Sequence, residues 1–155
     1  MLDRDSNVFI KNIDSVYKIR KAHYLKKKTE IGWSLGFDAV AQAGLDFHHY
    51  YKKELYPYAH KYKTGNDVSN LLPKDFYDYR KKIEYNNEEF TNFSPFIKFV
   101  NIMLSNVSYD KSNGLYNEMS LENNILKLNI ADTLIKNQKT KNSILNNIAY
   151  MYLLE

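Results

Sequence analysis

Apolar residues recur along this 155-residue chain at the three- and four-residue spacing of an α-helix, and no segment alternates convincingly between apolar and polar residues. Five glycines and three prolines are few for an all-β domain, which needs many tight turns. The chain is long enough to bury a core without disulfides or a structural metal. These observations predict an all-α fold, an irregular bundle of five to six helices that forms a single domain over residues 1–155.

The apolar spacing also predicts the helix boundaries. A break around Trp33, between Gly32 and Gly36, separates the first two helices, and Ser94 with Pro95 is expected to begin a later one by capping it. A loop is expected over residues 63–74 and a turn over residues 110–117. In chain order, we expect helices over residues 6–28, 35–56, 75–83, 94–107, 120–136 and from about residue 140 onward.

Each expected helix has an apolar face that is predicted to point inward. These faces comprise Phe9, Ile13, Val16 and Tyr17; Phe37, Val40, Gly44, Phe47, Tyr51 and Leu55; Phe96, Phe99, Val100, Met103 and Val107; and Leu121, Ile125, Leu128 and Ile135.

The segment DFHHYYKKELYPYAHKY, residues 46–62, contains three of the four histidines and five of the fourteen tyrosines. On a helix, His49 and His60 share a face but lie ~16 Å apart along the axis, too far to share one ion. Asp46 and His49 could reach one ion together, but zinc needs three or four protein ligands, and His23 could add a third only through tertiary folding. We therefore predict no metal site, and we interpret the histidines as lying at the edge of a packing face.

Pro57 changes the geometry of this segment. Its ring clashes with the carbonyl of Lys53 in a continuous helix, so a kink or a helix end is expected there. One hypothesis is that the surrounding side chains line an aromatic cleft for a ligand or a peptide; the other, which we favour, is that tyrosines cover the core at a helix junction. If this chain has a partner or ligand surface, its predicted residues are His49, Tyr56, Tyr58 and His60.

Charge and motifs exclude several function classes. The 22 basic residues exceed the 18 acidic ones by only four, and Glu30 directly follows the basic stretch from Arg20 to Lys28, so a solvated helix face is a better interpretation than a nucleic-acid site. There is no cysteine, no glycine-rich phosphate loop, no GxSxG and no HExxH. We predict no catalytic residues, no cofactor and no membrane span, and the sequence carries no signal for an oligomeric state.

Several segments together resemble a known family. They are FIKNIDSVY at 9–17, LYPYAH at 55–60, FYDY at 76–79, LNIADTLIKN at 128–137, KN at 141–142 and YLLE at 152–155. Their order resembles the helical region that precedes the thioredoxin domain in TlpA-like thiol:disulfide oxidoreductases of Gram-negative cell envelopes. The family's redox motif is Cys-x-x-Cys, whereas residues 33–36 here are WSLG, so no redox residue carries over.

The resemblance implies a non-catalytic accessory domain that spaces or orients a redox domain or contacts its client. The partners would be other domains of the same chain or a client protein, in the periplasm or cell envelope. The apolar helical pattern that still continues at residues 148–154 also suggests a piece of a longer protein. The alternative is a self-contained small helical binding protein, for example a phage or immunity-type inhibitor of a partner protein, which would be cytoplasmic.

Overall fold

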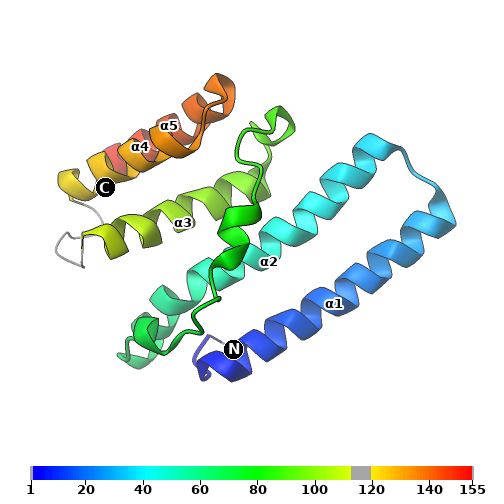
Figure 1. Cartoon of the computed structure of the whole chain (residues 1–155), viewed down its shortest axis with the longest axis horizontal. Coiled ribbons are helices and arrows are strands. Elements are labelled where there is room, and N and C mark those ends of the chain that lie inside the picture. Colours follow the sequence, from blue (N-terminus) through cyan, green and yellow to red (C-terminus); the bar gives the residue numbers. More distant parts are fainter. Residues whose placement is uncertain (1, 113–119, 155) are drawn as a thin grey trace. The chain divides into compact units, whose positions relative to one another are not determined.

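The computed structural model describes residues 2–112 and 120–154, and it confirms the all-α prediction (Figure 1). Within these ranges the chain has no β-strand, and three short 3₁₀ helices accompany the α-helices. In chain order the elements are α1 (Ser6–Ile31), α2 (Leu35–Thr64), η1 (Ser69–Leu71), η2 (Asp78–Lys82), η3 (Glu88–Phe90), α3 (Ser94–Lys111), α4 (Leu121–Leu134) and α5 (Gln138–Leu153).

The chain folds into two compact units, Met1–Arg80 and Lys81–Glu155. The first contains α1, α2 and η1, and the second contains η3 and α3 to α5. The prediction of a single domain over residues 1–155 stays a prediction.

In the first unit, α1 and α2 lie side by side and antiparallel, joined by a loop at the end far from the N-terminus (Figure 1). Asp5 caps α1 by accepting a hydrogen bond from the Asn7 amide, and Gly32 ends the helix with a left-handed φ of 62°. Ser34 then caps α2 by accepting from the Phe37 amide. The predicted break around Trp33 is therefore confirmed, although α1 runs three residues beyond the predicted end at residue 28.

The prediction that the second helix ends at residue 56 is wrong, because α2 continues through Pro57 to Thr64. It ends at Gly65, where φ is 76° and the amide bonds the Lys61 carbonyl at 2.8 Å. Proline removes one helical hydrogen bond, but packing on both sides of it offsets that loss here. Tyr56 and His60 are both buried, and both bind the N-terminal segment.

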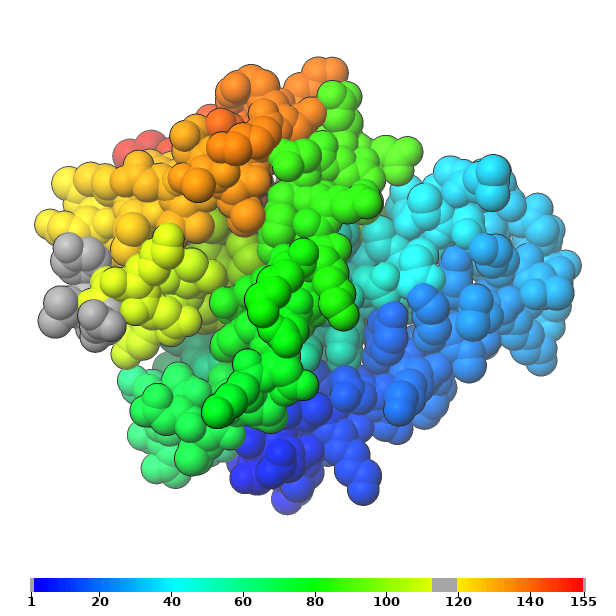
Figure 2. Space-filling view, viewed as in Figure 1, coloured from blue at the N-terminus to red at the C-terminus, as the bar shows by residue number. Residues whose placement is uncertain are grey.

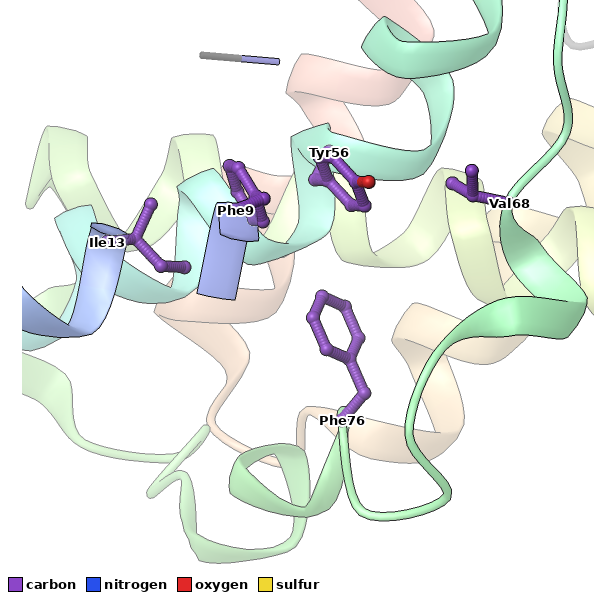
Figure 3. Close-up of a cluster of buried hydrophobic side chains, with 5 residues drawn as sticks. All are labelled: Phe9, Ile13, Tyr56, Val68 and Phe76. Atoms are coloured by element: carbon purple, nitrogen blue, oxygen red, sulfur yellow. The ribbon is translucent and has the colours of Figure 1, made fainter. Parts of the chain in front are cut away.

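The core of this unit is a cluster of five buried side chains: Phe9, Ile13, Tyr56, Val68 and Phe76 (Figure 3). Phe9 from α1 stacks on Tyr56 from α2, with ring centroids 4.0 Å apart and planes 12° apart. Val68 and Phe76 come from the segment that follows α2, so this segment covers the base of the helix pair. The predicted short helix over residues 75–83 is a 3₁₀ helix, Asp78–Lys82.

Several residues predicted to point inward are exposed. Val16, Phe37 and Val40 are exposed in the first unit because polar side chains make the contact between α1 and α2 at their level. Leu121 and Ile125 are exposed in α4. The buried side chains of α4 are Asn123, Asn124, Lys127 and Ala131. Of the predicted apolar stripe, Ile135 is buried just after the helix and Leu128 is half-buried, so the prediction is wrong for Leu121 and Ile125.

In the second unit, α4 and α5 pack against each other and against α3. Pro95 lies in the first turn of α3 as predicted, but Phe93 occupies the N-cap position and Ser94 is already helical, so Ser94 does not cap the helix. The buried apolar side chains of this unit are Tyr85, Phe96, Phe99, Val100, Met103, Leu104, Ala131, Ile135, Ile144 and Ile148.

Polar contacts also hold the second unit together. The side-chain oxygen of Asn86 accepts from the amides of Lys136 and Asn137, which joins the start of the unit to the turn between α4 and α5. The predicted turn over residues 110–117 is only partly testable, because α3 continues to Lys111 and residues 113–119 lie outside the described residues.

We predict that Phe9→Ala lowers the free energy of unfolding by about 3–5 kcal/mol, because it removes the ring that stacks on Tyr56 and leaves a cavity. Val8→Ala is the matched control, since Val8 is the neighbouring residue and is exposed, and it should change stability by about 0.5 kcal/mol or less. Urea unfolding followed by circular dichroism measures both variants, and equal losses would contradict this account of the core.

Candidate functional site

The most distinctive chemistry of the first unit is a set of carboxylates that we call the α2 carboxylates: Asp38, Asp46 and Glu54. They lie eight residues apart, about 2.2 helical turns, so they follow a slowly turning stripe along α2. Each accepts a hydrogen bond from a tyrosine hydroxyl. The donors are Tyr24 and Tyr17 of α1 and Tyr79 of the segment after α2.

Asp38 organises the loop between the two helices. It accepts from the Lys28 ammonium at 2.7 Å, from the Tyr24 hydroxyl at 2.6 Å and from the Trp33 indole N–H at 3.0 Å. These three bonds, with Lys28 the largest contributor, lower the pKa of Asp38 from 3.8 to about 2. The Trp33 ring also packs between Tyr24 and Phe37, so the loop has a defined conformation.

Asp46 holds the middle of the helix pair. It accepts from the Tyr17 hydroxyl through one oxygen and from the Gln42 amide, at 2.8 Å, through the other. Burial, together with the bond to Asp46, raises the pKa of Tyr17. Tyr17 therefore stays neutral and serves as a hydrogen-bond donor.

His49 lies one turn further along α2. Its Nε2 is 3.3 Å from a carboxylate oxygen of Asp14, and its ring packs on Tyr17 with centroids 4.7 Å apart. Burial lowers the pKa of His49, and the nearby charge of Asp14 opposes that shift. His49 and Asp46 face different partners, so the structure does not bring them together as ligands of one ion.

Glu54 is fully buried and binds both Tyr79 and Arg80. The Arg80 guanidinium donates to both of its oxygens, at 2.7 and 2.6 Å, and the Tyr79 hydroxyl donates at 2.6 Å. Such a bidentate pair combines charge with fixed geometry. Burial and the charge of Glu54 raise the pKa of Tyr79. Burial by itself lowers the pKa of Arg80, but the bonds from Glu54 outweigh it and the pKa is raised.

Aromatic rings enclose the Glu54 pair. Tyr50 stacks on Tyr79 with centroids 4.5 Å apart and planes 4° apart, and the Lys53 ammonium lies 4.8 Å from the Tyr79 ring. The Arg80 guanidinium lies 3.7 Å from the centre of the Tyr77 ring, a distance typical of a cation–π contact. Burial lowers the pKa of Lys53.

The four residues of the predicted partner surface do not share one environment. Tyr56 is 0% exposed and donates its hydroxyl to the Arg4 carbonyl at 2.8 Å, and His60 is 6% exposed with Nδ1 3.0 Å from the Leu2 carbonyl. His49 is largely buried beside Tyr17, and only Tyr58 is exposed. Tyr56 and His60 thus hold the N-terminal segment in place, and the binding of a partner through these four residues stays a prediction.

Tyr58 has an exposed neighbour that the sequence analysis did not single out. Tyr62, one helical turn later, is 82% exposed, and its ring stacks on that of Tyr58 at 6.5 Å. The sequence pattern also gave no prediction for Asp38, Glu54, Tyr24, Tyr79 and Arg80. The spacing of acidic residues at 38, 46 and 54 was a usable signal for the α2 carboxylates, but their tyrosine donors come from other elements.

The geometry suits structural roles better than acid–base catalysis. The α2 carboxylates accept hydrogen bonds from tyrosine, lysine, arginine and amide donors, which fix the orientation of each carboxylate. Among the described residues, no group of three His, Asp or Glu side chains is placed to hold a metal ion.

The chain matches no protein-family model, and comparison with curated proteins and with solved structures found no similar protein. Across the part of the chain that the structure describes, no helix is both long enough and apolar enough to cross a membrane.

We predict that Glu54→Leu lowers the free energy of unfolding by about 3–5 kcal/mol, because it leaves the largely buried Arg80 charge without its bidentate partner. The double variant Glu54→Leu/Arg80→Leu should be more stable than Glu54→Leu alone, since it buries no unpaired charge. Glu84→Leu, at an exposed position, is the control. If the double variant unfolds more easily than Glu54→Leu, the loss of the Glu54–Arg80 pair does not explain the lower stability of Glu54→Leu.

We predict that Asp38 titrates with a midpoint near pH 2 and that Trp33, the only tryptophan, reports it. The pKa of Asp38 is lowered by folding, so its stabilising effect is complete above its ordinary pKa of 3.8 and is lost as the pH falls toward about 2. The fluorescence of Trp33 should follow this change, and Asp38→Asn should abolish it. A midpoint at the ordinary value would show that Lys28, Tyr24 and Trp33 do not bind the carboxylate in solution.

Proposed function

We propose that this chain is a non-catalytic helical module that works by binding another protein. The observation that carries the proposal is that all three α2 carboxylates already accept hydrogen bonds from tyrosine hydroxyls, and Glu54 also from the Arg80 guanidinium. The bonds from Tyr17 and Tyr24 to Asp46 and Asp38 stabilise the contact between the two long helices α1 and α2. Long, rigid helices present side chains at fixed positions, which suits recognition of a partner.

The surface that we assign to this role is the exposed aromatic pair Tyr58 and Tyr62 near the end of α2. Tyrosine is enriched in protein interfaces because it offers a large apolar ring, a hydrogen-bonding hydroxyl and little conformational freedom to lose. Tyr58 was one of the residues expected to form a partner surface, and Tyr62 extends it by one helical turn.

The parent that we propose is a cell-envelope thioredoxin-like protein, in which this module would space or orient the redox domain or contact its client. Support comes from the order of the segments at residues 9–17, 55–60, 76–79 and 128–137, and from the absence of cysteine in the chain. In this proposal the thiol chemistry belongs to another domain. A thioredoxin fold with paired cysteines should then lie in the same polypeptide, and a reading frame without one contradicts the accessory role.

A site-specific photo-crosslinker at position 58 tests the binding surface. We expect an adduct with a thioredoxin domain or with a thiol-bearing client, and Tyr62→Ala should weaken it because the stacked ring is lost. A crosslinker at Lys98, an exposed residue of α3, is the control. An adduct with an unrelated protein would instead support a self-contained binding protein, and equal labelling from both positions would contradict a specific surface at Tyr58.

A further inference from the structure

The loop end of the α1–α2 pair exposes large apolar side chains. This surface, which we call the hairpin tip, comprises Ile31, Leu35 and Phe37, which are 63%, 87% and 55% exposed. It is the end of the pair farthest from the N-terminus, and the space-filling view shows it as the outer end of the first unit, in the blue-to-cyan part of the chain (Figure 2). Large apolar side chains gathered at one exposed loop are a candidate surface for contact with an apolar environment.

Basic side chains outnumber acidic ones from the middle of α1 to the first turns of α2, the part of the pair that includes the tip. Residues 18–40 hold six basic and two acidic side chains, which accounts for the whole net charge of +4, since the remaining 16 basic and 16 acidic residues cancel. Lys26, Lys27 and Lys28 precede the tip on α1, and their side chains are 72%, 43% and 47% exposed. The ion pairs of Lys26 and Lys27 with Glu30 are at the surface, where such pairs are weak and exchange readily with other anions. Lys28 instead pairs with Asp38, whose side chain is partly buried.

The tip is rigid, so a partner would meet it in a fixed shape. Asp38 binds Trp33, Tyr24 and Lys28, which ties the loop to both helices, and Gly32 and Ser34 set the end of one helix and the start of the next. A preformed surface needs little ordering when it binds.

We propose that the hairpin tip docks on the surface of an anionic lipid bilayer. At 1.5 Å per residue, Lys28 and Lys26 lie about 5 and 8 Å behind Ile31 along α1. An apolar tip that enters the boundary of the acyl chains to a depth of about 5–10 Å would place these lysines among the lipid phosphates and headgroup carboxylates. Trp33 would then lie at the interface, where tryptophan is favoured in membrane proteins.

The apolar residues favour a bilayer over a nucleic acid as the occupant. Lysines would contact the phosphates of either, but single-stranded nucleic acids bind exposed aromatic rings on which bases stack. The most exposed side chains of the tip are the aliphatic Leu35 and Ile31, which a base cannot stack on and an acyl chain can surround. This proposal goes beyond the protein-binding role and does not depend on it.

Sedimentation of the full chain with lipid vesicles tests the proposal, with Trp33 as an internal reporter. We expect binding to vesicles in which about a third of the phosphatidylcholine is replaced by phosphatidylserine, a blue shift of Trp33 emission, and weaker binding as salt is raised. Leu35→Ser should weaken binding about tenfold because one buried leucine is lost. Changing Lys26 and Lys27 together to glutamine, which leaves the Lys28–Asp38 pair of the loop intact, should weaken it about thirtyfold.

The controls distinguish vesicle binding through the tip from nonspecific binding by other surfaces of the chain. Leu71→Ser removes another exposed leucine, near Ser6 at the opposite end of α1, and the pair Lys63→Gln and Lys74→Gln removes exposed lysines outside the tip. Neither control should change binding, and circular dichroism should show every variant folded. Failure to bind the anionic vesicles, equal binding to pure phosphatidylcholine, or equal losses in the controls would overturn the proposal. Binding to a single-stranded oligonucleotide that needs the lysines but not Leu35 would overturn it in favour of a nucleic-acid site.

Discussion

The first unit depends on hydrogen bonds from tyrosine hydroxyls to the carboxylates of α2. Beyond Ile13, α1 buries only one more side chain, Tyr24, so apolar packing cannot by itself hold the rest of this helix against its neighbour. The bonds from Tyr17 to Asp46 and from Tyr24 to Asp38 do so instead. Hydrogen bonds to charged groups are stronger than neutral ones, and they need defined geometry, so they fix the register of the two helices.

The polar contacts between α1 and α2 also affect which side chains of the unit are exposed. Where tyrosine and carboxylate fill the contact between α1 and α2, apolar side chains at the same level, such as Val16, Phe37 and Val40, remain exposed. At the end of the pair near the N-terminus the contact is apolar instead, because Phe9, Tyr56 and Phe76 form an apolar core there. The unit thus has an apolar, tightly packed base and a polar, rigid arm whose tip is apolar outside.

Some features could be predicted from the sequence because they depend on neighbouring residues. Gly32 and Gly36 marked the break between the first helices, and the apolar spacing predicted a helix from residue 120, where Ser120 caps α4. Which of the candidate partner residues are buried and which are exposed could not be predicted in this way. Tyr56 and Tyr58 are two positions apart, yet one is buried against Phe9 and the other is exposed, because only the position of α1 decides which face of α2 is covered.

By itself, the sequence determined that the chain is helical, where its first interhelical break lies, and that it has no thiol for redox chemistry. Local spacing and capping depend on residues within a few positions of one another, so they can be read along the chain. Only the tertiary structure decided that α2 passes through Pro57, that Glu54 is buried with Arg80, and that Leu35 is exposed. The physical reason is that each of these depends on partners from other elements, whose distance in space the sequence does not state.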